Sequence, residues 1–193
     1  MDADARYRQV AALHAGNIDQ GFLATLGIPF LSLMYRAIDE ADDSVLLIEE
    51  REGRVVGFVS GSMGMGQIYR RMMRRPFVLA WTLWPSMLRP ARLKRIVDIL
   101  RYGTQSGGDV LLPEAELLSI AVSPDVRGRG VAEQLYRRLE ERFRERGVPA
   151  FRITVGDSLE PAHRFYLRMG AKPAARIEVH AGEGSVVYVH ELP

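Results

Sequence analysis

The residues of this chain best suited to chemistry lie in a basic, glycine-rich turn between two segments of regular structure. The turn reads Arg127-Gly128-Arg129-Gly130 and is followed by Val131 and Ala132. Apolar residues recur every four positions from 131 to 143, which predicts a helix that begins at the turn. The first N–H groups of a helix lack partners within it and carry about half a positive charge. Because glycine lets such a backbone approach an anion closely, the turn is suited to binding phosphate groups.

Two common phosphate-binding patterns do not fit this turn. A P-loop requires Gly-Lys-Ser/Thr at the start of its helix, and the chain contains no such run. A dinucleotide-binding fingerprint requires Gly or Ala three residues after the second glycine, where this chain has Glu133. A carboxylate at that place would repel a pyrophosphate. An ordinary basic surface turn is the remaining alternative, but the preceding strand and the following helix favour anion binding.

The spacing Arg127-x-x-Gly130-x-Ala132, directly after a predicted strand at 117–122, resembles the pyrophosphate loop of the GNAT superfamily of N-acetyltransferases. The run AHRFYLRMGA at 162–171 is similar to the A-x-x-F/L-Y-x-x-x-G-F signature of that family. The resemblance covers residues 1–63 and 111–193. It implies an α/β (α+β) GNAT fold, in which helices flank a central mixed, mostly antiparallel sheet, and a single domain over 1–193.

The resemblance also implies acetyl-CoA as co-substrate, no metal, and a set of residues that hold the co-substrate. In the family, the strands equivalent to 117–122 and 151–155 splay apart, and the pantetheine arm pairs with the free backbone of the first strand. A backbone N–H at a bulge there, of Ile120 or Val122, polarises the thioester carbonyl. Where the family usually has Asn, this chain has Leu159, and Ser158 would replace the Asn contact. The residues expected to bind acetyl-CoA are Ile120, Ala121, Val122, Arg127, Gly128, Arg129, Gly130, Val131, Ala132 and Ser158.

Two residues carry the catalytic roles that the resemblance implies. Tyr166 would donate a proton to the departing thiolate, since a phenol with a pKa near 10 can protonate a thiolate. Glu116 would deprotonate the amine, commonly through a water molecule. Glu114 or water alone is the alternative base, while Thr154, where some relatives carry Glu, cannot act as one. The alternative roles are core packing for Tyr166 and a solvated strand end for Glu116.

The elements that position these residues follow from hydrophobic periodicity and turn residues. The strand that usually precedes the first helix of the family has no counterpart, so we expect it to be missing, truncated or encoded upstream of Met1. The remaining order predicts helices at 4–16, 20–38, 130–146 and 161–169, strands at 45–50, 55–60, 117–122 and 150–155, and a last hairpin of 174–180 and 185–191.

Residues 64–110 interrupt the family order with an insert, which we expect to form two or three amphipathic helices broken at Pro76, Pro85 and Pro90. Between 66 and 108 there are nine Arg or Lys residues and one acid, a balance of +8 that leaves −6 for the rest of the chain. The apolar run is too short to span a bilayer. The insert would suit a lid over the acceptor, a homodimer contact or a peripheral membrane surface. Nucleic acid is less favoured, because no recognition motif accompanies the charge.

Composition narrows the remaining function classes. The chain has no cysteine, which excludes disulfides, thiolate metal sites and a cysteine nucleophile, and its four histidines lack ligand spacing. The acidic start Met1-Asp2-Ala3-Asp4 is unlike a signal peptide, so we expect a cytoplasmic protein. The resemblance implies an acetyl-CoA-dependent N-acetyltransferase that moves an acetyl group to the amine of a small-molecule or amphiphilic acceptor by direct attack in a ternary complex. The alternatives are acetylation of a protein N-terminus or lysine, and a non-catalytic acyl-CoA-binding module that docks through its basic insert.

Overall fold

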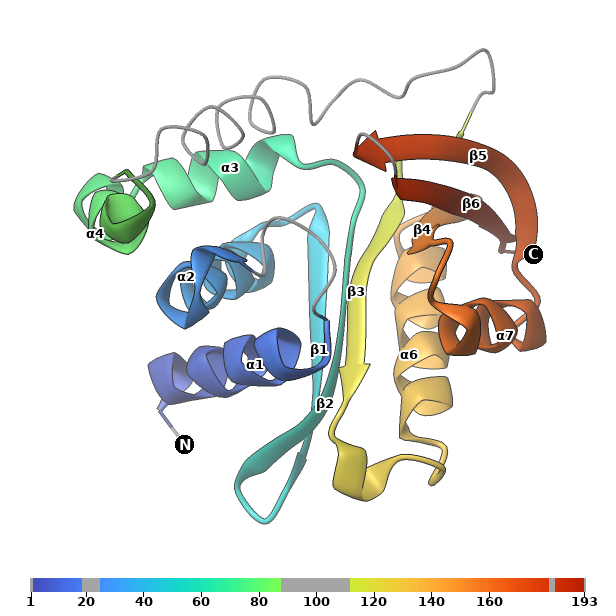
Figure 1. The fold of residues 1–193 in the computed structure, drawn as a ribbon, viewed down its shortest axis with the longest axis horizontal. Coiled ribbons are helices and arrows are strands. Elements are labelled where there is room, and N and C mark those ends of the chain that lie inside the picture. Colours follow the sequence, from blue (N-terminus) through green and yellow to red (C-terminus); the bar gives the residue numbers. More distant parts are fainter. Residues whose placement is uncertain (1, 19–24, 88–111, 181–182, 193) are drawn as a thin grey trace.

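The computed structural model describes residues 2–18, 25–87, 112–180 and 183–192. They form one six-stranded sheet in the order β1-β2-β3-β4-β6-β5 (Figure 1). Neighbouring strands are antiparallel except for β3 and β4, which are parallel, so the predicted mixed, mostly antiparallel sheet is confirmed. The strands are β1 (Ser44–Arg51), β2 (Arg54–Ser62), β3 (Glu116–Val122), β4 (Ala150–Gly156), β5 (Lys172–His180) and β6 (Glu183–Glu191).

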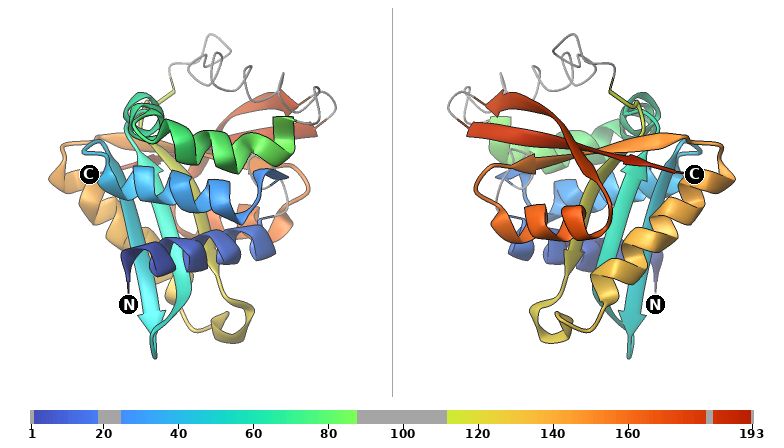
Figure 2. Two further views of the ribbon diagram at one scale, coloured as in Figure 1. Left: turned by 90° about the vertical axis from the view of Figure 1, so that its left-hand side faces the viewer. Right: turned by 90° about the vertical axis from the view of Figure 1, so that its right-hand side faces the viewer.

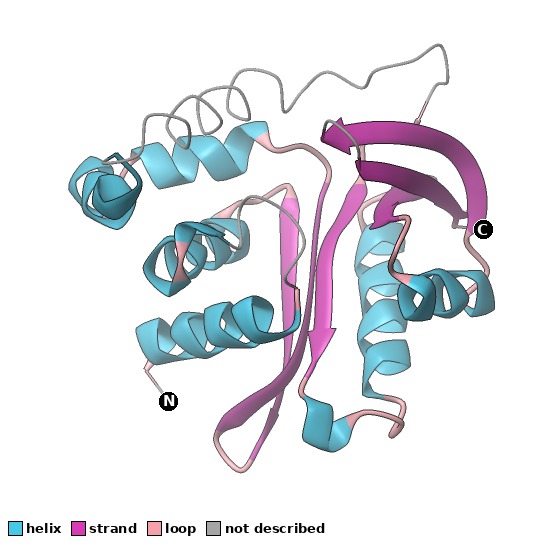
Figure 3. Ribbon diagram, in the orientation of Figure 1, coloured by secondary structure: helices cyan, strands magenta, loops and turns pink. Residues whose placement is uncertain are grey.

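Helices cover both faces of the sheet (Figures 2 and 3). On one face lie α1 (Ala3–Asn17), α2 (Ile28–Glu40), α3 (Gly66–Met73) and α4 (Pro76–Met87). On the other face lie α6 (Val131–Glu145) and α7 (Glu160–Arg168). A short 3-10 turn, η2 (Pro124–Val126), connects β3 to the glycine-rich turn. Among the described residues no strand precedes α1, as the sequence predicts.

Two glycines of β2 let α6 pack closely on the sheet. The predicted apolar face of α6 is confirmed, because Val131, Leu135, Leu139 and Phe143 are all buried. A Cβ added at Gly61 would lie 2.7 Å from the Phe143 ring, and one at Gly57 would lie 3.1 Å from both Leu135 and Val131. Both contacts are closer than ordinary packing allows, so the absence of side chains in β2 sets the distance between helix and sheet.

The predicted helix over 20–38 is wrong at its start, since α2 begins at Ile28. Gly27 has a φ of +88°, a left-handed conformation that a helix cannot include. Pro29 follows at the beginning of α2, where its missing N–H costs nothing. Residues 20–24 of the prediction lie outside the described residues. The apolar face expected farther along is present, and it includes Phe30, Leu33, Met34 and Ala37.

The insert forms α3 and α4 over its described part, and one predicted break is wrong. Pro76 begins α4 as predicted, because the first turn of a helix needs no N–H donor. Pro85 does not break α4, which continues to Met87. Proline removes one backbone hydrogen bond there, and the residues on either side of it stay helical. The predicted break at Pro90 and the remainder of the insert to 110 lie outside the described residues.

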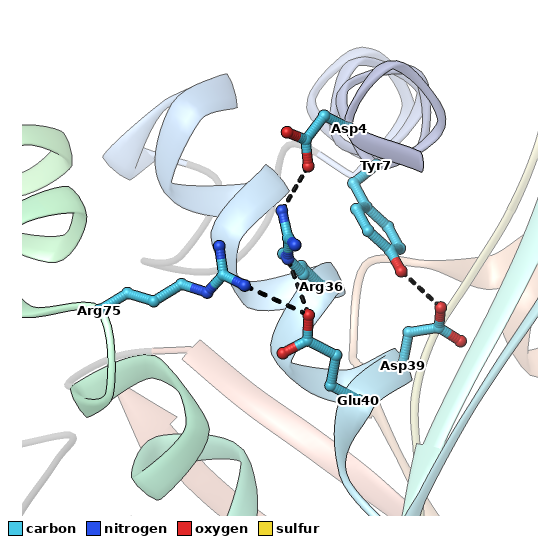
Figure 4. A network of polar contacts seen from close by, with 6 residues as sticks. All are labelled: Asp4, Tyr7, Arg36, Asp39, Glu40 and Arg75. Carbon is cyan, nitrogen blue, oxygen red and sulfur yellow. Dashed lines mark hydrogen bonds and ion pairs between the residues drawn. The ribbon is translucent and has the colours of Figure 1, made fainter. Parts of the chain in front are cut away.

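Ion pairs hold the insert against α2, and α2 against α1 (Figure 4). Arg75, between α3 and α4, lies 3.5 Å from Glu40 of α2, which also accepts a hydrogen bond of 2.8 Å from Arg36. On α1, the Tyr7 hydroxyl donates to Asp39 at 2.6 Å. Burial, with the Asp39 carboxylate beside it, raises the pKa of Tyr7 to about 12. The helical layer that carries the insert is therefore joined through polar contacts as well as through its apolar core.

Candidate active site

The parallel strands β3 and β4 separate soon after they meet. They pair only at Glu116 with Arg152 and at Leu117 with Ile153. Beyond these pairs, residues 118–122 of β3 have no partner in β4, and Figure 1 shows the two strands running apart. The divergence expected from the resemblance is therefore present, and it leaves one backbone edge of β3 open.

A β-bulge marks the point where β3 turns away. Leu117 is paired with Gly61 of β2 and Ser119 with Ser60, so Leu118 has no partner of its own. An extra residue of this kind bends the strand and increases its local twist. The bulge lies directly after the last pair with β4, and it accounts for the separation of the two strands.

The open edge of β3 presents the backbone groups of Ile120 and Val122. Residues of an antiparallel strand turn their N–H and C=O groups alternately toward and away from the partner strand. The Ser123 N–H donates to Val56 of β2 at 2.8 Å, which assigns Ala121 to the same side, facing β2. Ile120 and Val122 therefore turn their polar groups into the gap between β3 and β4. Of the three strand residues expected to bind acetyl-CoA, these two offer backbone donors there and Ala121 does not.

The glycine-rich turn has the backbone geometry of an anion site. Gly128 and Gly130 have φ values of +73° and +76°, conformations that favour glycine. No atom lies within 4 Å of where a Cβ would stand at either residue, so space is open above both. The first backbone bond of α6 runs from the Gln134 N–H to the Gly130 carbonyl, at 3.0 Å. The N–H groups that precede it in α6, beginning at Val131, are therefore available to a phosphate.

The side chains around the turn differ in their partners. Glu133 pairs with Arg168 of α7 at 2.6 Å, so its carboxylate is neutralised. Arg127 donates to the Val122 carbonyl at 3.3 Å and to the Asn17 side chain at 2.5 Å, which links the end of β3 to α1. Arg129 is exposed, and no ion pair of it is found among the described residues. Arg129 is thus the more available cation for a pyrophosphate in this arrangement.

Glu116 lies where β3 and β4 part, and two side chains of β4 hold it. The Arg152 guanidinium donates to one carboxylate oxygen from two nitrogens, at 2.9 and 3.0 Å, and the Thr154 hydroxyl donates to the other at 3.2 Å. Burial and the Glu116 charge together raise the pKa of Tyr69, a residue of α3 in the insert. The carboxylate is therefore fixed in position, and the insert contributes to its surroundings.

Sequence reasoning missed the partners of Glu116. Arg152 and Thr154 are two residues apart on β4, and the alternation of a strand places them on one face. That signal is visible only once β4 is known to lie beside β3. The alternative base Glu114 precedes β3 and is exposed, so it is not part of the strand. Ser158 is exposed in the turn between β4 and α7.

Tyr166 lies in the core between α6, α7 and the sheet. Its ring is 6.1 Å from that of Tyr136 and 6.4 Å from that of Tyr188, between centroids. Burial raises the pKa of Tyr166, which keeps the phenol protonated at neutral pH. No hydrogen bond to its hydroxyl is found in the described part of the chain. One turn earlier, His163 contacts the Tyr188 hydroxyl at 2.8 Å and the Gly156 carbonyl at 3.1 Å. The role of Tyr166 as proton donor stays a prediction.

A buried chain of polar side chains reaches β3 from α1. His14 Nδ1 lies 2.6 Å from the Tyr35 hydroxyl, which lies 2.9 Å from the Ser119 hydroxyl. Ser119 in turn lies 2.7 Å from the Ser60 hydroxyl on β2. Burial lowers the pKa of His14 to about 4, so this imidazole is neutral at physiological pH. Sequence reasoning did not find this network, because its members are far apart in the chain and share no motif.

Within the described residues, no three His, Asp or Glu side chains are grouped as a metal site would require. No helix in the same ranges has both the length and the apolar character needed to cross a membrane.

Comparison with known proteins agrees with this geometry. Residues 96–171 match the acetyltransferase (GNAT) family, whereas no curated protein matches the chain. An N-acetyltransferase from Staphylococcus aureus Mu50 superposes with a TM-score of 0.61 at 16% identity, over 98% of this chain and 94% of that one. An aminoglycoside 6'-N-acetyltransferase complexed with coenzyme A gives 0.60 at 12% identity, over 98% and 92% of the two chains. The ribosomal-protein-S18-alanine N-acetyltransferase of Escherichia coli gives 0.54 at 16%, over 95% and 87%.

Such identities show a shared fold. The family match adds sequence evidence over the glycine-rich turn, β4 and α7, where the candidate site is built. Residues 96–171 therefore match the acetyltransferase (GNAT) family, and the fold of the chain is the one that these solved N-acetyltransferases share.

Proposed function

We propose that this protein transfers the acetyl group of acetyl-CoA to the amine of a small-molecule or amphiphilic acceptor, by direct attack within a ternary complex. The observation that carries the proposal is the open edge of β3. The backbone groups of Ile120 and Val122 lie between an anion-binding turn and a fixed carboxylate, Glu116. The order of these three features along β3 is the order of the groups of acetyl-CoA, which has a pyrophosphate, then the pantetheine arm, then the thioester.

Acetyl-CoA would bind along β3. The backbone N–H groups at Gly130, Val131 and Ala132 would receive the pyrophosphate, with the Arg129 guanidinium adding charge. The pantetheine arm would then add to the sheet as an extended strand does, by pairing with Ile120 and Val122. The thioester would reach the region where β3 and β4 separate, which is also where Glu116 is held.

The chemistry then needs three groups. The amine nitrogen attacks the thioester carbonyl carbon, and an N–H of β3 stabilises the oxyanion that forms. Glu116 accepts the proton of the amine, through water, while Arg152 and Thr154 hold its carboxylate in place. The carbon–sulfur bond breaks, and Tyr166 gives its proton to the thiolate. One proton is thus taken up and one released for each acetyl group transferred.

Calorimetry with acetyl-CoA tests the binding half of this proposal. We expect Gly130→Asp to abolish binding, because it adds a negative charge and a side chain where the pyrophosphate must approach. Gly147→Asp is the matched control. Gly147 also has a positive φ, +70°, and open space around it, but it lies at the opposite end of α6. Unchanged affinity in the Gly130 variant would contradict the assignment, while loss in both variants would indicate a general effect on folding.

Turnover with an amine panel tests the catalytic half. The panel should include an aminoglycoside, a long-chain amine, a lysine-containing peptide and a peptide with an N-terminal alanine. Acetylation of the first two would support the proposed acceptor class, and acetylation of a peptide would favour the protein-directed alternative. Tight acetyl-CoA binding with no turnover on any amine would instead indicate a non-catalytic binding module.

A further inference from the structure

The described part of the insert presents an apolar ridge to solvent. Phe77, Trp81 and Trp84 are 89%, 79% and 63% exposed. They are four and three residues apart, so they lie along one side of α4. Other α4 residues are turned to the protein, where Thr82 is buried and Leu79 and Leu83 pack against the core. The helix is therefore attached by one side and leaves large aromatic side chains uncovered on another, which is unusual for a soluble surface.

The ridge is uncharged, and its surroundings are positive. α4 contains no charged residue, and residues 63–87 contain four arginines and no acid. Arg71 and Arg75 pair with α2 at 3.5 Å each, which secures the insert to the domain. Arg70 and Arg74 are exposed, and no ion pair of either is found among the described residues.

Other occupants of the ridge fit these observations less well. Figures 1 and 2 show α4 against α2, on the side of the sheet away from β4, whereas the insert residue near Glu116 is Tyr69 of α3. The ridge is thus not a wall of the acetyl-transfer site. A symmetric dimer through this face would bring the arginines of two copies together, which costs energy. A polynucleotide would need cations along the contact itself, where the chain has only apolar side chains.

We propose that this ridge, with the exposed Arg70 and Arg74 in the segment that leads into α4, docks the protein peripherally on an anionic lipid bilayer. Tryptophan and phenylalanine side chains are favoured at the level of the lipid headgroups, where apolar rings can leave water. Arginines next to them attract anionic headgroups, by about 1 kcal/mol each, which is roughly fivefold in affinity per residue. This inference does not depend on acetyl transfer, since it rests on the exposed side of α4 and on two exposed arginines of the insert.

Intrinsic fluorescence of the full chain tests the inference directly. The chain has two tryptophans, and both lie on the ridge. We expect solvent-exposed emission in the free protein. Vesicles of phosphatidylglycerol and phosphatidylcholine should shift it to shorter wavelength, and brominated acyl chains should quench it. Vesicles of phosphatidylcholine alone should produce little change, and added salt should weaken the response.

Co-sedimentation of variants with the same anionic vesicles separates the contribution of the arginines to binding from that of the tryptophans. We expect Arg70→Gln with Arg74→Gln to weaken binding more than tenfold, and Trp81→Ala with Trp84→Ala to abolish it. Leu167→Ala is the matched control, because Leu167 is a half-exposed apolar residue of α7 on the other face of the sheet. It should bind as the parent does. Retained acetyl-CoA affinity in each variant shows that it is folded.

Three results would overturn the inference. The first is tryptophan emission that anionic vesicles do not change. The second is emission that is already shielded in the free protein and becomes exposed on dilution, which would assign the ridge to a second copy of the chain. The third is a response to an oligonucleotide with none to vesicles, which would assign the positive surface to nucleic acid.

Discussion

Acidification should destabilise this protein through one buried histidine. His14 is 6% exposed, its ring lies nearly parallel to that of Phe58, and its Nδ1 contacts the Tyr35 hydroxyl. Burial lowers its pKa from 6.5 to about 4. Between these values the unfolded chain binds a proton that the folded chain does not, so the free energy of unfolding falls as pH falls. The contribution is complete above pH 6.5 and is lost progressively toward pH 4.

The size of the effect follows from the two pKa values. A pKa of about 4 in the fold against 6.5 in the unfolded chain corresponds to a loss of about 3 kcal/mol. A domain is typically stable by about 5–15 kcal/mol, so such a loss is readily measured. Burial also lowers the pKa of His190, and that side chain adds a loss of the same sign. The contribution of His14 must therefore be measured as a difference between two proteins.

Urea unfolding followed by circular dichroism, from neutral pH to about pH 4, makes that comparison between the parent and His14→Phe. The variant keeps an aromatic ring against Phe58 and removes the titration. It should be less stable at neutral pH by about 1 kcal/mol, because Tyr35 loses one hydrogen-bond partner. Its stability should then fall by about 3 kcal/mol less than that of the parent on acidification. Parallel curves for the two proteins would refute the reasoning, since they would show that His14 titrates alike in both states.

Three further substitutions test the site and its support. Tyr166→Phe should keep acetyl-CoA affinity and lower kcat by about 10²–10⁴-fold, the usual effect of losing a general acid; turnover equal to that of the parent would leave the residue a packing role. Glu116→Gln should lower kcat by a similar factor of about 10²–10⁴, whereas Glu114→Gln should leave it near the parent value; the reverse order would identify the other carboxylate as the base. Gly61→Ala should lower the free energy of unfolding by about 1–3 kcal/mol, because the added methyl group meets an aromatic ring of α6. Gly64→Ala, where the methyl group has open space, is the control for that thermal or urea measurement, and equal losses would show that packing on β2 is not the cause.

Local patterns predicted much of the fold. The apolar face of α6 depends on residues that are neighbours in the chain, and it is present as predicted. The start of α2 was mispredicted because apolar spacing continues across Gly27, whose backbone conformation ends any helix there. Pro85 was mispredicted because the loss of one backbone hydrogen bond does not outweigh the packing of α4 on the core through Leu79 and Leu83.

The candidate site also has one part that local sequence predicts and another part that only the fold brings together. The glycine-rich turn is one short motif, and the sequence alone predicts its place at the start of α6. The partners of Glu116 come from another strand, so they become apparent only when the parallel pairing of β3 and β4 is known. The contacts from His14 through Tyr35 to Ser119 join three separate elements by tertiary packing, and no spacing in the chain records them.

The bulge at Leu118 also determines which insertions and deletions the chain can tolerate. Side chains of a regular strand alternate between faces, so Glu116 and Ser119, three residues apart, would point to opposite sides of the sheet. The extra residue brings both to the side covered by α2 and α3, where Ser119 meets Tyr35 and Glu116 lies near Tyr69. Loss of a single residue from β3 would turn either the carboxylate or the hydroxyl toward the apolar packing of α6. Length changes in this chain are thus expected to accumulate in the connections between elements, as the 64–110 insert illustrates, while β3 keeps its residue count.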